Sequence, residues 1–212
     1  MPLNSSRDIA PPATELELAF VKQNLRIDYT DDDAIITQLI GSARERCEAW
    51  CNRSFIIRQR VAYYDKITKR FELPRPPVTS VDSLTLIYLN EVVTLTANQD
   101  YYLMDTQGGL GDSFVILTAT TYNLPPGFSL GDDLWRFNVQ ALYHAGWDTD
   151  YPANKTGSLI PYGVQEAILK TVGSAYNLRA NVQGIQRTGT SGFMELPENA
   201  KQLLQPYKNV TI

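Results

Sequence analysis

The spacing of apolar residues changes twice along this chain. Over residues 31–51 they recur three or four positions apart, which predicts an amphipathic helix. From residue 55 onward the period becomes two, which predicts β-strands, and helical spacing returns over residues 161–180. The sequence therefore predicts helices in the first and last parts of the chain and strands between them.

Capping residues mark where these helices begin. Thr14 and Glu17 have the spacing of a capping box and predict a short helix over residues 14–25. Thr30 is the predicted N-cap of the long helix, because three aspartates, residues 31–33, would then fill its first turn and interact favourably with the helix dipole. A last short helix is expected to stop near Pro206.

About five or six strands are predicted between the helices. Ile57, Gln59, Val61 and Tyr63 alternate with their neighbours, and a hairpin is expected to turn at Asn90–Glu91. Further strand candidates are residues 100–105, 113–119 and 134–147. In the last of these, one face is predicted to carry Trp135, Phe137, Val139, Ala141 and Tyr143, and the other Arg136, Asn138 and Gln140.

A proline-rich stretch, FELPRPPVTSVDSLTL (residues 71–86), precedes the hairpin. Proline fixes φ and removes a ladder donor, so Pro74, Pro76 and Pro77 suit a strand entry or edge rather than the middle of a sheet. Pro74 and Pro77 also satisfy P-x-x-P next to Arg75, but an SH3-type ligand needs an exposed, free segment. The favoured interpretation is an extended entry into the β-region.

The order of the elements predicts an α+β fold. Helices from both ends of the chain are expected to pack together as a small bundle, with an antiparallel β-lobe inserted between them. The predicted limits are a mobile N-terminal arm over 1–13, a helical domain over 14–54 and 158–212, and the β-lobe over 55–157.

Composition and charge narrow the function classes. The 212 residues are 43% hydrophobic and carry a net charge of −4, which argues against a protein whose main task is to wrap nucleic acid. Neither a signal peptide nor an apolar run long enough to span a membrane is recognisable. With only Cys47 and Cys51, four positions apart on one predicted helix, we expect a soluble protein made in a reducing compartment.

Candidate chemistry is sparse. His144, the single histidine, is a conceivable general base with Asp148 or Asp150, but no nucleophile motif accompanies it, and a structural histidine is the favoured interpretation. Cys47 and Cys51 lack the two further ligands of a zinc site, which favours core packing. Counted from Asp28, the acidic run also departs from the calcium-loop pattern. We expect no enzyme activity, cofactor or metal.

Several stretches together resemble the gp6-like head–tail connectors (adaptors) of tailed bacteriophages, of the long type. The resemblance covers most of residues 15–208 and lies in the order and spacing of the stretches rather than in any one motif. The stretches are LELAFVKQNLRIDYTDDDAIITQLIGSARERCEAWCNRSFI, FELPRPPVTSVDSLTLIYLN, LYHAGW, IPYGVQEAILKTVGSAYNLR and LLQPYK.

The resemblance implies a structural role in the virion neck. Members of the family form a homo-oligomeric ring, about twelvefold, below the portal; the ring extends the DNA channel and docks the next neck or tail protein. Genomic DNA would pass through the lumen without sequence-specific binding, which an acidic subunit suits. The protein would be made in the bacterial host cytoplasm and would end in the virion, with no membrane contact.

The resemblance also implies that the C-terminal segment contacts the portal protein. The candidate interface residues are Gln205, Pro206, Tyr207, Lys208, Asn209, Val210, Thr211 and Ile212. The mobile N-terminal arm and the loop over residues 181–192 are further segments expected to become ordered on a neighbour. Two alternatives remain open: another neck component, such as a stopper or tail-completion protein dominated by a β-barrel, and a hydrolase that uses His144.

Overall fold

The computed structural model describes residues 3–9, 16–65, 70–88, 91–105, 112–118, 138–147, 160–181 and 195–209. The chain divides into two compact units. A β-unit comprises residues 1–13 and 56–158, and a helical unit comprises residues 14–55 and 159–212. The fold class is α+β, as predicted, with helices and two antiparallel sheets.

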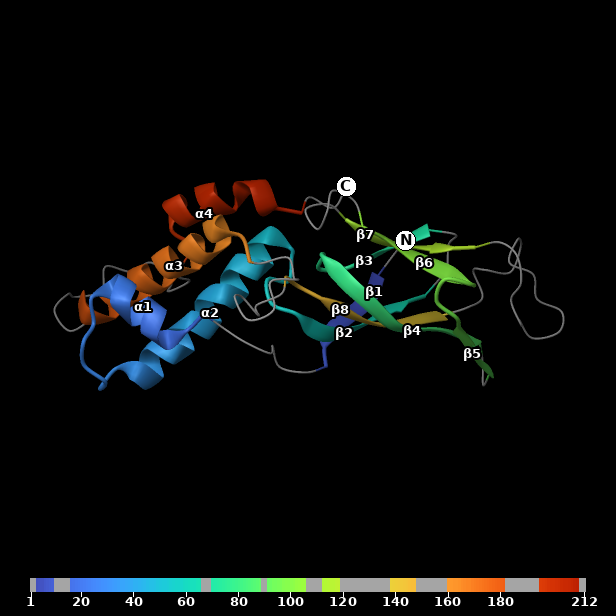
Figure 1. Ribbon diagram of the computed structural model, residues 1–212, viewed down its shortest axis with the longest axis horizontal. Helices are drawn as coiled ribbons and strands as arrows, with labels where there is room; N and C mark the ends of the chain where they lie inside the picture. The colour runs from blue at the N-terminus through green and yellow to red at the C-terminus, as the bar shows by residue number, and fades with distance from the viewer. Residues whose placement is uncertain are drawn as a thin grey trace. The chain divides into compact units, whose positions relative to one another are not determined.

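The helical unit brings together segments from both parts of the sequence (Figure 1). Helix α3 packs against both α2 and α4, and the short α1 contacts α2 and α3. This confirms that helices before and after the β-region pack together. The elements are α1 (Leu18–Leu25), α2 (Asp33–Cys51), α3 (Tyr162–Asn181), α4 (Glu198–Leu204) and the 3-10 helix η2 (Gln205–Tyr207).

The start of α2 differs from the prediction. Its N-cap is Asp32, and the Thr30 carbonyl accepts a hydrogen bond from the Asp33 amide at 3.1 Å, so Thr30 was the wrong cap. Tertiary partners use the acidic side chains: Lys22 Nζ lies 2.5 Å from Asp33 Oδ1, and the Tyr176 hydroxyl donates to Asp32 Oδ2 at 2.6 Å. Helix α1 likewise begins after Glu17, without a side-chain cap, and Thr14 lies outside the described residues.

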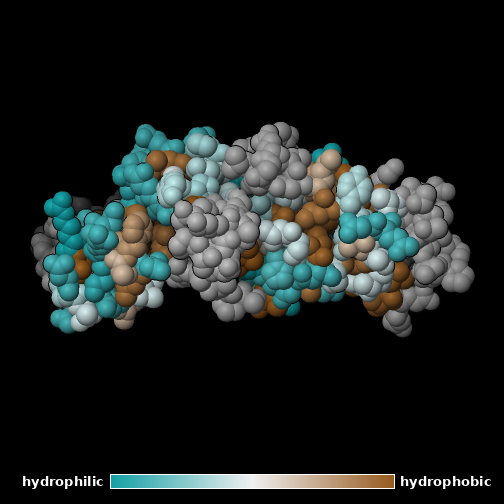
Figure 2. Space-filling view, viewed as in Figure 1, coloured by the Kyte–Doolittle hydropathy of each residue, from teal (hydrophilic) through white to brown (hydrophobic). Residues whose placement is uncertain are grey.

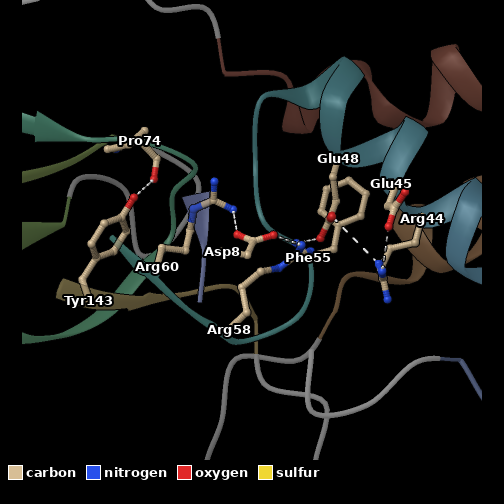
Figure 3. A network of polar contacts seen from close by, with 9 residues as sticks. All are labelled: Asp8, Arg44, Glu45, Glu48, Phe55, Arg58, Arg60, Pro74 and Tyr143. Carbon is tan, nitrogen blue, oxygen red and sulfur yellow. Dashed lines mark hydrogen bonds and ion pairs between the residues drawn. The ribbon is translucent and has the colours of Figure 1, made fainter. Parts of the chain in front are cut away.

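Most of the predicted apolar face of α2 is buried, although Leu39 and Trp50 are half-buried, and two charged residues lie beside it. Arg44 and Glu48 are both buried, and their side chains approach within 3.9 Å. Glu48 Oε1 also accepts a hydrogen bond from the Phe55 amide at 2.7 Å, which fixes the chain just beyond the helix (Figure 3). Buried apolar residues of the unit are Val21, Ile27, Ile36, Ile40, Ala43, Cys47, Cys51, Phe55, Val164, Ala167, Ile168, Leu169, Val172, Ala175, Leu196, Ala200 and Leu204.

The β-unit contains two antiparallel sheets (Figure 1). The five-stranded sheet has the order β1-β2-β8-β4-β5, and the three-stranded sheet has the order β3-β7-β6. One apolar cluster draws residues from both sheets, so each sheet buries one face in a shared core. The strands are β1 (Leu3–Asp8), β2 (Arg58–Tyr64), β3 (Arg70–Leu73), β4 (Val78–Tyr88), β5 (Glu91–Leu95), β6 (Tyr101–Asp105), β7 (Ser113–Leu117) and β8 (Asn138–Ala145).

Strand β8 confirms the alternation predicted for it. Val139, Ala141 and Tyr143 are buried, whereas Asn138 is exposed and Gln140 is half-buried. The predicted hairpin between β4 and β5 is also present, but Glu91, expected in its turn, is the first residue of β5 and the register partner of Tyr88. Trp135, Arg136 and Phe137 lie outside the described residues.

Strand β1 corrects the prediction of a mobile arm. Residues Leu3–Asp8 pair antiparallel with β2 and form an edge of the five-stranded sheet. Asp8 places its carboxylate against two arginines of β2, with Nη1 of Arg58 2.9 Å away and Nη1 of Arg60 in direct contact. This polar segment is ordered by its pairing with β2 and by the neutralisation of Asp8 by the two arginines. Neither contact can be recognised from the local sequence pattern of residues 3–8.

The proline stretch connects the two sheets. It leaves β3 of one sheet at Leu73 and enters β4 of the other at Val78. The Pro74 carbonyl accepts a hydrogen bond from the Tyr143 hydroxyl at 2.8 Å, and the Pro77 carbonyl accepts one from the Gly146 amide at 2.8 Å. Pro76 and Pro77 are buried, so this segment is a structural crossing rather than a free P-x-x-P ligand.

Candidate interaction surfaces

The predicted portal-binding segment is partly described. Gln205, Pro206 and Tyr207 form η2, and Lys208 and Asn209 follow it, whereas Val210, Thr211 and Ile212 lie outside the described residues. Gln205, Pro206 and Lys208 are exposed, Tyr207 is half-buried and Asn209 is buried. Only part of the candidate set is thus available to a partner in this structure.

Residues 207–209 pack against the C-terminal end of α2. Asn52, which follows that helix, adopts the left-handed conformation (φ 53°), a common way to end a helix. Beyond it, Arg53 Nε donates to the Tyr207 carbonyl at 2.6 Å, and the Asn209 amide donates to the Cys51 carbonyl at 2.7 Å. These contacts satisfy a helix-end carbonyl that would otherwise need water.

Trp50, near the end of α2, also contacts the C-terminal segment. The sequence did not predict this contact. Lys208 Nζ lies 4.7 Å from the centroid of the Trp50 ring, a cation–π distance. The Asn209 side-chain Nδ2 is buried and makes no hydrogen bond with the described residues. Lys208 and Trp50 thus form a cationic and aromatic surface beside the point where the chain continues to residues 210–212.

An open groove of about 420 Å³ crosses the helical unit between α1, α3 and the start of α4. Gly173 lets α1 approach closely, because a Cβ at that position would lie 3.3 Å from Leu25 Cδ2. The lining is mixed rather than apolar, with three asparagines. The lining residues are Asn24, Leu25, Glu166, Leu169, Lys170, Gly173, Ser174, Asn177, Pro197 and Asn199.

Each unit exposes large apolar side chains. In the β-unit, Val92 is 64% exposed on β5, and Tyr102 and Met104 are exposed on β6; both strands are sheet edges within the described residues. Figure 2 shows hydrophobic surface over the end of this unit that carries β5. In the helical unit, Tyr162 is 78% exposed at the start of α3. Exposed apolar side chains on unpaired edges favour contacts with other chains.

His144 lies within a polar cluster on the five-stranded sheet. Its Nδ1 is 3.1 Å from Asp82 Oδ1 and 3.4 Å from Ser80 Oγ. In a catalytic triad the carboxylate and the nucleophile contact opposite ring nitrogens, whereas here both lie at Nδ1. The arrangement therefore holds the ring on the sheet and does not activate the serine. Asp148 and Asp150, the partners considered from sequence, lie outside the described residues.

Cys47 and Cys51 are buried in the helical core, as predicted. Cys47 Sγ lies 3.8 Å from Thr171 Oγ1, and Cys51 Sγ lies 3.9 Å from the Leu204 carbonyl oxygen. Burial raises the pKa of Cys47 to about 11 and that of Cys51 to about 12, so both thiols stay protonated at neutral pH. Within the part of the chain that the structure describes, no group of three metal-ligating side chains occurs.

Arg58 and Arg60 were missed as buried residues. Alternation in β2 pointed to Ile57, Gln59, Val61 and Tyr63 as one face, yet the opposite residues Arg58, Arg60, Ala62 and Tyr64 are all buried. Asp8, in a strand far away in sequence, supplies the countercharge (Figure 3). In the sequence, Arg58, Arg60, Ala62 and Tyr64 alternate with their neighbours. This alternation does not predict burial of the arginines unless a carboxylate such as that of Asp8 is known to lie beside them.

On β8, the strand that pairs with the other side of β2, the Tyr143 hydroxyl donates to the Pro74 carbonyl (Figure 3). Burial raises the pKa of the Tyr143 phenol, so the hydroxyl remains a donor throughout the physiological pH range.

No helix among the described residues is both long and apolar enough to cross a membrane.

Three solved structures share this fold over nearly the whole chain. A chain from the neck of an empty gene transfer agent (GTA) particle, computed with C6 symmetry, has a TM-score of 0.70 at 16% identity and covers 98% of this chain and 97% of that one. A chain from the native GTA virion has a TM-score of 0.68 at 15% identity, covering 98% and 96%. A third, from the native GTA neck computed with C12 symmetry, has a TM-score of 0.64 at 16% identity, covering 100% and 97%.

The fold is thus one that occurs in chains of GTA necks and virions. Residues 15–106 match the family described as "Phage gp6-like head-tail connector protein", which confirms the relationship predicted from the sequence. No curated protein matches the chain at a significant level.

Proposed function

We propose that this chain is a structural head–tail connector of a phage-like virion. The observation that carries the proposal is the family match over residues 15–106, supported by a fold shared over 98% of the chain with a GTA neck protein. The protein is a neck component, and its work is assembly rather than chemistry. The stopper or tail-completion alternative led us to expect dominance by a β-barrel, whereas here helices form a unit of their own.

The assembled form is a closed homo-oligomeric ring, about twelvefold, below the portal. Support comes from the C12 symmetry used for one neck structure that contains a similar chain. The ring extends the DNA channel, and the net charge of −4 per subunit keeps non-specific contacts with DNA phosphates weak. Exposed apolar side chains on β5 and β6 are candidate contacts between subunits or with the next neck or tail protein.

The portal contact lies at the C-terminal segment, Gln205 to Ile212. The exposed residues Gln205, Pro206 and Lys208 surround the point where the chain leaves the α2 surface toward residues 210–212. Because the backbone of residues 207–209 is already held on α2, a partner that binds there does not have to order this part of the segment.

Two features argue against a hydrolase. Ser80 and Asp82 compete for the same nitrogen of His144, and both cysteines have raised pKa values that disfavour a thiolate nucleophile. His144→Ala is therefore expected to leave assembly intact.

Mass photometry of the purified chain, alone and with a candidate portal ring, tests the proposal. We expect one high-order closed species whose mass is an integer multiple of 23.8 kDa, alone or on the portal. A monomer or dimer that does not bind the portal would overturn it.

Charge reversal at the C-terminal segment tests the portal contact itself. Lys208→Glu combined with deletion of residues 210–212 should weaken portal binding at least about tenfold while the chain stays folded. Lys201→Glu is the matched control, with the same charge change on the neighbouring helix α4. Equal loss in both variants would show that general charge, not this segment, determines binding.

A further inference from the structure

Strand β1 is attached to the β-unit without being part of its core. None of its described side chains belongs to the apolar cluster that unites the two sheets. Ser5, Arg7 and Asp8 are exposed and Ser6 is half-buried. Among the described contacts, the strand is held by its backbone pairing with β2 and by the Asp8 carboxylate, whereas the residues of the shared core come from the other strands.

The outer edge of β2 presents two buried arginines to a carboxylate on the strand that pairs with it. Arg58 and Arg60 are each only 7% exposed, and Asp8 contacts Nη1 of both. Asp8 is also the register partner of Arg60, so the strand must sit in one register for the charges to meet. Buried guanidinium groups tolerate little loss of such a partner, which makes this edge selective.

The chain can leave this edge without disturbing the helical unit. Strand β1 belongs to the β-unit, and the next element along the chain, α1, belongs to the helical unit. The connection from Ile9 to Leu18 spans at most about 30 Å when fully extended, and this length limits how far β1 could lie from its own α1 in an assembly.

We propose that in the assembled ring β1 is exchanged between neighbours, so that β1 of one copy pairs with β2 of the next and its Asp8 neutralises that copy's Arg58 and Arg60. The inference rests on the proposed function, because exchange needs an adjacent copy. After exchange, each β1 makes the same contacts with the neighbour's β2 that it made with its own. The energy of these contacts is therefore the same before and after exchange. The high effective concentration of neighbours in a ring then permits it, and each exchanged strand ties two subunits together.

A cysteine pair across the two strands tests this directly. Ser5 and Tyr63 are register partners, neither is fully buried, and neither belongs to the core cluster. The variant Ser5→Cys/Tyr63→Cys is oxidised as isolated subunits and as rings whose formation mass photometry has verified, and the products are separated on denaturing, non-reducing gels. Cys47 and Cys51 remain in place, because both are buried.

We expect the isolated subunit to form an intrachain disulfide and to migrate as a monomer. The rings should give a ladder of covalent multiples of the 23.8 kDa chain. Rings mixed from Ser5→Cys and Tyr63→Cys single variants should give covalent dimers, which only pairing between different chains can produce. The control Ser5→Cys/Gln140→Cys should give neither product, because β2 lies between these positions and separates them by about 10 Å.

Verified rings that yield only intrachain disulfides, with no dimer from the mixed variants, would overturn strand exchange and leave the connector function standing. Failure of the wild-type chain to form any ring, alone or on the portal, would overturn both.

Discussion

The first and last described segments of the chain, Leu3–Asp8 and Gln205–Asn209, are both polar, and both are held by tertiary contacts of different kinds. The first combines backbone pairing to β2 with side-chain charge, because Asp8 also bridges two buried arginines. The second relies mainly on backbone groups, because the Asn209 amide and the Tyr207 carbonyl bond to the end of α2 and to Arg53. The difference predicts that single substitutions will loosen the first segment more than the second.

The largest expected effect is at Asp8. Asp8→Ala leaves two buried guanidinium groups without this carboxylate and should lower the free energy of unfolding of the β-unit by about 2–3 kcal/mol, less than for a fully buried pair because Asp8 is 39% exposed. Urea unfolding measures the change. Arg7→Ala, at the exposed neighbouring position, is the control and should change stability by less than about 0.5 kcal/mol. Similar losses in both variants would contradict the role of Asp8.

A smaller effect is expected at Arg53. Arg53→Ala removes the 2.6 Å hydrogen bond to the Tyr207 carbonyl and should cost about 1–2 kcal/mol. Hydrogen exchange measures this locally, since the Asn209 amide, now bonded to the Cys51 carbonyl, should exchange faster than in the wild type. Amides in the middle of α3 serve as the internal reference. Unchanged protection at Asn209 would show that the segment is held elsewhere.

The reactivity of the two thiols gives an independent measure of packing near the second segment, because the Cys51 carbonyl accepts the hydrogen bond from the Asn209 amide. With pKa values of about 11 and 12, Cys47 and Cys51 should resist a thiol reagent at pH 8 in the folded protein and react after unfolding in urea. The folded pKa values lie above the ordinary 9.0, so the unfolded state loses its protons first. Stability is then retained below about pH 9 and falls as pH rises toward 11–12. Rapid labelling of the native protein would contradict the burial of both thiols.

The smallest effect is expected at Lys208. Its contact with the Trp50 ring is at the surface, so Lys208→Ala should cost only about 0.5 kcal/mol, measured as a small shift in the urea midpoint. Gln205→Ala, another exposed position of the same segment, should cause no measurable change. A loss above about 1.5 kcal/mol at Lys208 would show that the side chain anchors the segment and would reverse the contrast with Asp8.

Local pattern predicted some elements well and others poorly, for physical reasons visible at single strands. Strand β8 follows its alternation, since Val139, Ala141 and Tyr143 face the shared core. Strand β2 buries the face that carries Arg58 and Arg60, against the hydrophobicity of its residues. The two strands differ because the buried arginines of β2 have a counterion, the Asp8 carboxylate of β1, which lies about 50 residues away in the sequence.

The candidate surfaces show the same limit. The sequence marked Gln205–Ile212 as a unit, but the structure buries Asn209 and leaves Lys208 exposed beside Trp50. Which residues of a short polar segment face outward depends on what the backbone bonds to, and here that partner is the end of a helix whose sequence lies about 150 residues earlier.

By itself the sequence determined the periodicity of the elements, the α+β class, the burial of Cys47 and Cys51, and the relationship to gp6-like connectors. These follow from local spacing, which fixes the faces of helices and strands. Only the tertiary structure decided that β1 is a strand, that Arg58 and Arg60 lie inside, and that the C-terminal segment rests on α2. Each of these depends on a charge or a hydrogen-bonding group from a distant segment, and such pairing leaves no periodic trace along the chain.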